Sequence, residues 1–107
     1  MSLIWKKDKN IELINEFIDS NLVEKGNTKN TVSAYNNDLI QFTDWLNKKK
    51  FELKNLTENN LEAYLIYLGK RGYKASSISR KTACLKAFFK FLLSENYKKN
   101  NLMKNIN

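Results

Sequence analysis

The apolar positions of the chain recur with a helical period in four stretches, and this pattern predicts four main helices. The first helix is expected over residues 10–25, where one apolar stripe gathers Ile11, Ile14, Phe17, Ile18 and Leu22. Gly26 follows as the expected C′ residue, the position at which a helix often ends in a left-handed conformation. Residues 1–9 are expected to form an N-terminal tail that can include a cloning scar.

The second helix is expected to run from Asn30, as its N-cap, to about Lys48. Its core stripe repeats at helical spacing and comprises Val32, Tyr35, Leu39, Phe42 and Leu46. The opposite face is polar and comprises Asn30, Ser33, Asn37, Gln41 and Asp44. The lysines at 48–50 suit the negative end of the helix dipole.

The third helix is expected to follow Thr57, as its N-cap, and to run to about Arg71, before Gly72. Its buried stripe comprises Leu61, Tyr64, Leu65 and Leu68. The fourth helix is expected to open at Ser76 or Ser77, as an N-cap, and to run to about Glu95.

The fourth helix has two contrasting sides when its residues are placed at about 100° intervals. The apolar side gathers Ile78, Leu85, Phe88, Phe89 and Leu92. The other side has three cations, two hydroxyls and no carboxylate, and it gathers Ser79, Arg80, Ala83, Lys86, Ala87, Lys90 and Ser94.

These elements predict an all-α fold with four main helices in an orthogonal or bundle-like packing. The domain is expected over residues 10–96, and the basic, Asn-rich residues 97–107 are expected to form a linker or a frayed end. A length of 107 residues with 42% hydrophobic and 12% aromatic content is enough for one folded core.

Composition argues against several classes of function. The chain has no histidine, which removes Ser-His-Asp chemistry and histidine-based zinc sites. Its one cysteine, Cys84, lies inside an expected helix and is interpreted as a small, semi-buried filler. No Gly-rich phosphate loop is present. We therefore expect no cofactor, no metal, no small-molecule ligand and no enzymatic activity from this chain on its own.

The sequence also has no apolar run of the roughly 18–20 residues that would span a bilayer, and no secretory signal at its start. We expect a cytoplasmic protein without a membrane partner. The net charge of +8 and the pI of about 9.6 favour a polyanionic partner. Lysine and asparagine are also abundant in AT-rich coding sequences, so charge alone does not decide the function.

Several motifs occur in a fixed order. The second helix has the motif residues Asn30, Thr31, Tyr35, Asp38, Leu39 and Phe42. Leu56-Thr57 opens the third helix, and residues 72–77 form a Gly-Tyr-Lys-Ala-Ser-Ser turn. Arg80 precedes the aromatic-rich core of the fourth helix. With these residues the chain resembles the N-terminal core-binding (SAM-like) domain of tyrosine recombinases, closest to the bacterial Xer group and the phage integrases. The likeness covers roughly residues 10–100, and it departs from the family at Asn101-Leu102, where an Asn-Pro pair is usual.

The resemblance implies that this chain is an excised part of a longer recombinase, and that residues 97–107 lead towards a missing catalytic domain. The family's catalytic domain has two arginines, a lysine, a His-containing motif and a tyrosine nucleophile. This chain has only Arg71 and Arg80 as arginines and no histidine, so none of its tyrosines is identified as the nucleophile. The implied partners are double-stranded DNA and neighbouring recombinase subunits.

The resemblance also points to DNA-contacting positions on the second and fourth helices: Thr31, Ser33, Ala34, Asn37, Lys74, Ser76 and Arg80. Helical periodicity independently places four of them on polar sides, namely Ser33, Asn37, Ser76 and Arg80, and it adds Lys86 and Lys90. The helix starts would hold phosphates, the lysines would supply attraction independent of sequence, and Arg80 would bind a phosphate or a guanine.

Several of these positions also have a purely structural explanation, and Thr31 can simply be a residue of the first helical turn. Ser76 or Ser77 can be an N-cap, Lys86 and Lys90 can lie on an ordinary solvated face, and Arg80 can pair with a carboxylate. Two other functions stay open. One is a small helical protein–protein interaction module with a basic face. The other is a stand-alone DNA-binding regulator, because the turn at 72–75 is short enough for a helix-turn-helix.

Overall fold

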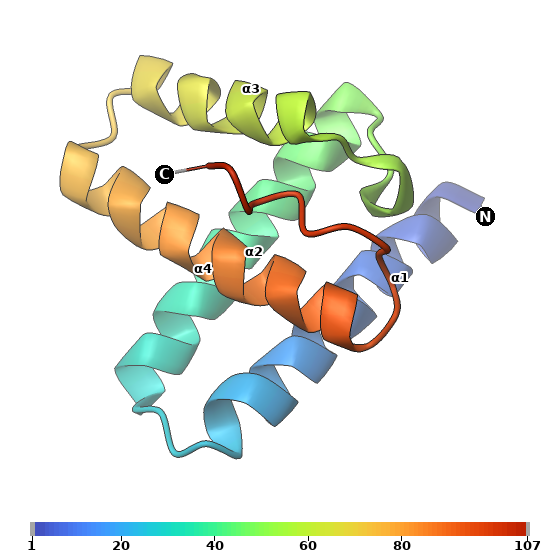
Figure 1. Cartoon of the computed structure of the whole chain (residues 1–107), viewed down its shortest axis with the longest axis vertical. Helices are drawn as coiled ribbons and strands as arrows, with labels where there is room; N and C mark the ends of the chain where they lie inside the picture. The colour runs from blue at the N-terminus through green and yellow to red at the C-terminus, as the bar shows by residue number, and fades with distance from the viewer. Residues whose placement is uncertain (1, 107) are drawn as a thin grey trace. The chain divides into compact units, whose positions relative to one another are not determined.

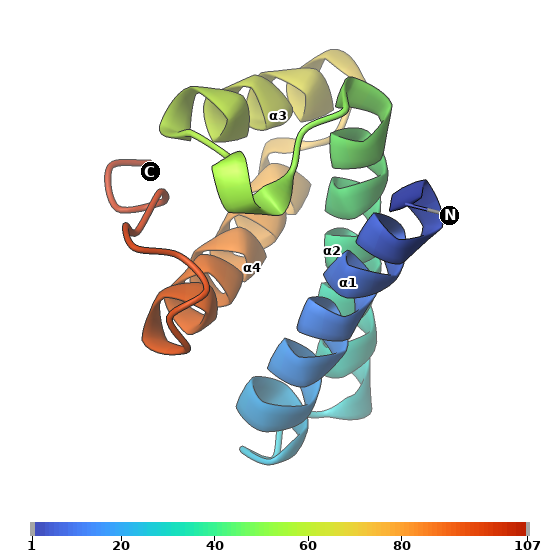
Figure 2. The ribbon, with the colours of Figure 1, turned by 90° about the vertical axis from the view of Figure 1, so that its right-hand side faces the viewer.

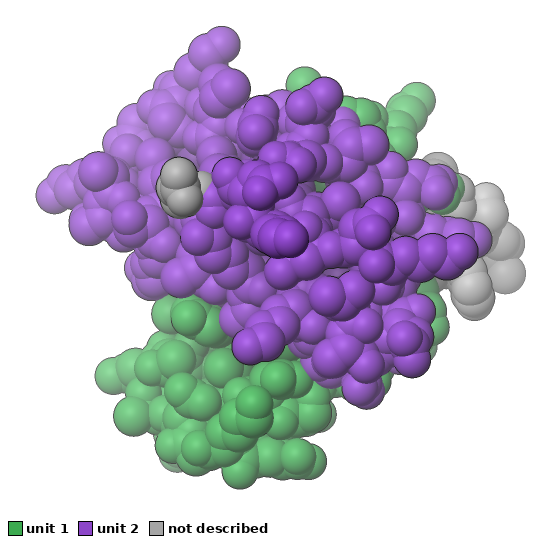
Figure 3. Space-filling model, in the orientation of Figure 1, with its two compact units in different colours: residues 1–53 green, residues 54–107 purple. Residues whose placement is uncertain are grey.

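Helices account for nearly all of the regular structure in this computed structural model, which describes residues 2–106, with side chains from residue 9. The elements are α1 (Ser2–Phe17), η1 (Ile18–Val23), α2 (Lys29–Lys49), η2 (Leu53–Asn55), α3 (Glu58–Lys70) and α4 (Ala75–Ser94) (Figure 1). No strand occurs within this range, and the predicted all-α fold with four main helices is confirmed. The chain divides into two compact units, residues 1–53 and residues 54–107 (Figure 3).

In unit 1, α1 and η1 run beside α2 (Figure 2). Helix α1 begins at Ser2, inside the segment predicted to be a tail. Ile11, the first residue of the predicted apolar stripe, is 42% exposed, whereas Leu13, which was not placed in that stripe, is 7% exposed. Leu13 and Phe17 move the centre of the buried stripe away from Ile11.

The first helix is followed, as predicted, by a glycine in a left-handed conformation, but its last turns are not α-helical. Its last residues, Ile18–Val23, form a π-helix in which Ser20 Oγ donates a hydrogen bond to the Glu16 carbonyl at 2.8 Å. Gly26 has φ +79, and the N–H of Asn27 donates to the Leu22 carbonyl at 3.0 Å. This closure is the αL ending expected at Gly26.

Helix α2 begins one residue before the expected N-cap. Its N-cap is Thr28, which has an extended backbone and whose side chain accepts a hydrogen bond from the N–H of Thr31 at 3.2 Å. The prediction of Asn30 as N-cap is therefore wrong, since Asn30 lies within the helix. Residues buried along α2 include Leu39, Phe42, Trp45 and Leu46.

In unit 2, α3 has the N-cap expected from the sequence. The Thr57 side chain accepts from the Asn60 N–H at 3.2 Å, and the Asn60 side chain accepts from the Thr57 N–H at 3.0 Å, which is a capping box. Leu61, Tyr64 and Leu68 are buried as predicted. Gly72 has φ +87 in the turn that leads to α4.

Helix α4 starts earlier than expected, and neither Ser76 nor Ser77 is its N-cap. The N-cap is Lys74, which has the extended backbone of a cap but makes no side-chain capping hydrogen bond. The buried side of α4 has the predicted large residues Leu85, Phe88, Phe89 and Leu92, each at most 2% exposed. Cys84 is fully buried among them, more deeply than the semi-buried position expected from the sequence.

The segment after α4 makes specific contacts with the rest of unit 2. Lys98 Nζ donates to the carbonyls of Lys54 at 2.8 Å and of Leu56 at 3.4 Å. Met103 and Ile106 are only 2% and 6% exposed. The described part of the predicted linker therefore contributes buried side chains and hydrogen bonds.

Candidate nucleic-acid interface

The net positive charge of the chain lies in its second half. Residues 1–53 have eight cationic and eight acidic side chains, whereas residues 54–107 have eleven cationic and three acidic ones. The whole net charge of +8 therefore belongs to unit 2. Within that unit, residues 63–94 have seven cations and no carboxylate. Such a stretch creates a positive potential that attracts polyanions.

Most of these cations are on the surface. Six of the seven are exposed, namely Lys70, Arg71, Lys74, Arg80, Lys86 and Lys90. Lys81 is the exception at 7% exposure, and its Nζ lies 4.9 Å from the centroid of the Tyr73 ring. This cation–π contact accommodates the ammonium against an aromatic face instead of water.

Helix α4 presents several of these cations on one side. We define the cationic face of α4 as the stripe that comprises Ser76, Ser79, Arg80, Ala83, Lys86 and Lys90. All six residues are exposed, and the residues between them include the buried Leu85, Phe88 and Phe89. The two sides predicted from helical periodicity are thus present. The face combines three cations with two hydroxyls and the small side chain of Ala83.

The start of α4 adds backbone donors to this face. The first N–H groups of a helix have no partner within the helix. At α4 the N-cap side chain of Lys74 does not accept from any of them. The N–H of Ile78 is the first to bond in helical fashion, to the Lys74 carbonyl at 3.0 Å. The N–H groups beside exposed Ser76 lie at the positive end of the helix dipole.

The four candidate residues on α2 lie in unit 1. Ser33 and Asn37 are exposed, whereas Thr31 and Ala34 are half-buried. The Thr31 N–H is already donated to Thr28 Oγ1, which in turn donates to Thr31 Oγ1 at 3.1 Å. Thr31 can therefore offer its hydroxyl to a ligand without disturbing the cap, but not its backbone N–H.

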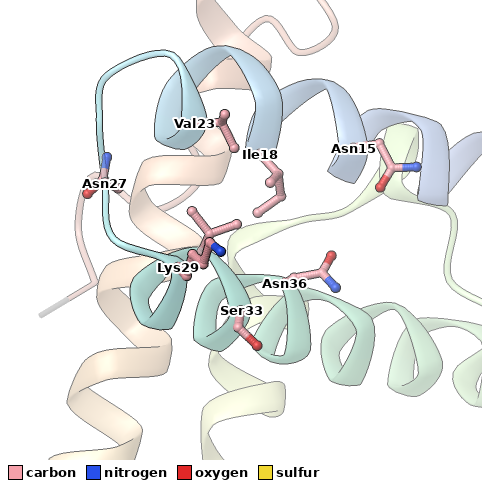
Figure 4. A pocket seen from close by; sticks show the side chains of 8 residues that line it. Asn15, Ile18, Val23, Asn27, Lys29, Ser33 and Asn36 are labelled. Atoms are coloured by element: carbon pink, nitrogen blue, oxygen red, sulfur yellow. The ribbon is translucent and has the colours of Figure 1, made fainter.

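A pocket of about 440 Å³ opens in unit 1 where η1 ends and α2 begins (Figure 4). Ile18 and Val23 point from η1 towards α2, and Lys29, Ser33 and Asn36 line the pocket from α2. Asn15 and Asn27 complete its polar rim, although the amide of Asn27 is engaged with the Leu22 carbonyl at 3.1 Å. Ser33 thus lies at the edge of a surface depression.

One pair of polar residues was not identified from the sequence. Arg71 Nη1 donates a hydrogen bond to Tyr67 Oη at 2.7 Å, and the guanidinium carbon lies 5.6 Å from the centroid of the same ring. This hydrogen bond raises the pKa of Arg71 above its usual value. The spacing of four residues on a helix is a signal for such a pair, but periodicity alone does not show that the two side chains meet.

The described residues offer neither a membrane-spanning helix nor a cluster of metal ligands. No helix there is both long and apolar enough to cross a membrane. In the same part of the chain, no three histidine, cysteine, aspartate or glutamate side chains gather in a way that could hold a metal ion.

Comparison with known proteins identifies the family. The model of the phage integrase N-terminal SAM-like domain matches residues 14–96. The tyrosine recombinase XerD of Rickettsia bellii (strain RML369-C) is 34% identical over 96 residues, which cover 90% of this chain and 32% of that protein. XerD of Haemophilus influenzae is 36% identical over 90 residues, covering 84% and 30%. The tyrosine recombinase XerC of Herpetosiphon aurantiacus is 35% identical over 80 residues, covering 74% and 26%.

The chain thus spans about a third of the length of the curated relatives that it matches. The match includes both candidate surfaces, on α2 and on α4. The resemblance inferred from the motifs is confirmed: this chain belongs to the family of phage integrase N-terminal SAM-like domains.

Proposed function

We propose that this chain is the core-binding domain of a site-specific tyrosine recombinase and that it binds duplex DNA. The observation that supports this most is the cationic face of α4, which is exposed and free of carboxylates in a chain that belongs to an integrase family. In this proposal the domain clamps the duplex and positions it. A catalytic domain elsewhere in the longer protein would cut and rejoin the DNA.

The cations of unit 2 would bind the phosphate backbone. Lys74, Lys86 and Lys90 supply attraction that does not depend on sequence, since each neutralises a phosphate and releases counterions. Arg80 has a planar guanidinium with several donors, which suits a bidentate contact to a phosphate or to the O6 and N7 of guanine. Ser76 and the backbone N–H groups beside it would bind a phosphate at the start of α4.

Helix α2 would contribute neutral contacts. Its unit has equal numbers of cationic and acidic side chains, so hydrogen bonds would dominate there. The Thr31 and Ser33 hydroxyls and the Asn37 amide can bond to phosphates or base edges. Ala34 has no polar atoms beyond the backbone, and its small side chain lets a DNA strand approach α2 closely.

The proposal extends to the longer protein through the relatives. Proteins named tyrosine recombinases share about a third of their length with this chain. We propose that the longer protein joins DNA through a phosphotyrosine, without a metal or nucleotide cofactor. Its further partners would be neighbouring recombinase subunits on the same DNA site, in the cytoplasm.

The test is equilibrium binding of the domain to a short labelled duplex at about 50 mM and about 200 mM salt. If four cations each contact a phosphate, this fourfold rise in salt weakens binding about 150-fold. Arg80→Ala should weaken binding at both salt concentrations and flatten the salt dependence. The isolated domain is expected to bind only weakly, because few phosphates are contacted.

A binding curve that is the same at both salt concentrations would contradict the proposal. So would complete absence of binding at the lower salt concentration. That outcome would favour the alternative of a protein–protein interaction module whose basic face meets an acidic partner. The same alternative predicts that, where any DNA binding is measured, charge reversal at Lys86 and Lys90 leaves the affinity unchanged.

A further inference from the structure

The end of α3 presents a second group of cations, separate from the cationic face of α4. Lys70 and Arg71 lie at the end of α3, and Lys74 lies just beyond the Gly72 turn. All three are exposed, and they fall in the stretch of residues 63–94 that has no carboxylate. No residue of this turn offers a carboxylate that could neutralise these cations.

The Arg71 side chain is positioned by Tyr67, which in turn packs on Tyr64. Its Nη1 donates to Tyr67 Oη at 2.7 Å. The Tyr67 ring stacks on the Tyr64 ring, with centroids 6.1 Å apart and planes inclined by 25°. Tyr64 is itself only 1% exposed. The guanidinium is thus joined through two aromatic rings to the core of unit 2.

This arrangement leaves donors for a ligand. A guanidinium has five N–H donors in a fixed plane. Within the described residues, the side-chain hydrogen bond that Arg71 makes is the one to Tyr67. An arginine held in one orientation loses less conformational freedom on binding than an unrestrained one, which raises affinity. Planar donors of this kind suit the oxygens of a phosphate.

We propose that Arg71, positioned by Tyr67, is a phosphate-contacting residue that extends the DNA-binding surface of unit 2 from α4 to the end of α3. Lys70 and Lys74 flank it and add attraction to the same strand. This inference rests on the proposed function. It adds a contact outside α2 and α4, the helices to which the motif resemblance points.

The experiment measures binding to a short labelled duplex over a series of salt concentrations for the wild type and four variants. Arg71→Ala should weaken binding about tenfold at low salt, since a charge-assisted contact is lost. It should also lower the slope of log affinity against log salt by about 0.9, the value for one phosphate. Tyr67→Phe retains the charge and the ring but removes the hydroxyl, so it should weaken binding about threefold with the slope unchanged.

Lys104→Ala is the matched control, because Lys104 is an exposed cation of the same unit outside the carboxylate-free stretch. It should change neither affinity nor slope appreciably. Arg80→Ala serves as the reference for the α4 face. Thermal melting of each variant separates binding from stability, since Arg71 at a helix C-terminus can also stabilise the helix.

The outcomes distinguish the two proposals. If the wild type binds and Arg80→Ala weakens it, but Arg71→Ala behaves like Lys104→Ala, the Arg71 contact is refuted and DNA binding by α4 stands. A lower melting temperature for Arg71→Ala with unchanged binding would also refute it, by assigning Arg71 a structural role. If the wild type does not bind the duplex at all, the proposed function itself fails.

Discussion

At the scale of single residues, Lys98 joins the segment after α4 to the segment before α3. Its ammonium donates to the carbonyls of Lys54 and Leu56. We predict that Lys98→Met, which keeps the length of the side chain, destabilises the protein by about 1 kcal/mol, because the carbonyls of Lys54 and Leu56 lose their donor. Urea denaturation measures this, with exposed Lys99→Met as the control. Equal stability of the two variants would contradict it.

The same residue gives the stability a defined pH dependence. Burial lowers the pKa of the Lys98 amine from 10.5, because the charged form is less well solvated in the folded state. Between the folded-state pKa and 10.5 the unfolded chain therefore binds more protons at this site, so this contribution to stability rises with pH. The stability gap between the wild type and Lys98→Met should therefore widen as the pH rises towards 10.5. A gap that narrows would show that the hydrogen bonds of the ammonium outweigh its burial.

At the scale of elements, α3 and α4 start in different ways. The N-cap of α3 is Thr57 in a reciprocal capping box, whereas the N-cap of α4 is Lys74 without a capping side chain. A lysine there contributes charge but leaves the first N–H groups of α4 without a side-chain acceptor. The start of α4 is therefore less stable than a capped one, and its first backbone N–H groups stay available to a phosphate.

We predict that Lys74→Ser stabilises the protein by about 1 kcal/mol and weakens DNA binding. Serine accepts from the first turn of the helix at a position whose backbone is already extended, while one cation is lost. Thermal melting and duplex binding, measured on the same samples, test the two effects. Thr57→Ala is the contrasting control, since it should lower stability by about 1 kcal/mol and leave DNA affinity unchanged. A Lys74→Ser variant that is less stable than the wild type would contradict the argument.

The helix starts also show what could be predicted from the sequence. Periodicity placed Leu85, Phe88, Phe89 and Leu92 on the buried side of α4, because these apolar residues repeat at helical spacing over several turns. It did not separate Ile78 from Ala87, since both are half-buried. It did not place the N-caps of α2 and α4. At α2, Thr28 and Asn30 are both residues that can cap a helix, and Thr28 is the N-cap. At α4, the helix begins directly after the turn at Gly72, before either serine can be its N-cap. Nor could periodicity place the Tyr67–Arg71 pair, since their meeting depends on the stack of Tyr67 upon the Tyr64 ring.

At the scale of the whole molecule, the net charge is divided unevenly between the two units. The regular structure of the described residues is helical in both units, yet all of the net charge belongs to residues 54–107. A polyanion would therefore bind to unit 2 through charge and to unit 1 through neutral donors. It follows that the salt dependence of DNA binding should be set by unit 2 alone, since only charge neutralisation releases counterions.

Two double variants test this prediction, and each removes two of the lysines behind the net charge of +8, so that both have the same lower charge. Lys86→Gln with Lys90→Gln removes two exposed cations from the cationic face of α4, and should lower the slope of log affinity against log salt by about 1.8. Lys48→Gln with Lys49→Gln removes two exposed cations from the end of α2 in unit 1, and should leave the slope nearly unchanged. Equal slopes for the two variants would mean that DNA responds to total charge and not to the face of α4. Because both pairs are exposed, melting temperatures should stay within a few degrees of the wild type, so any difference in slope reports where the phosphates lie.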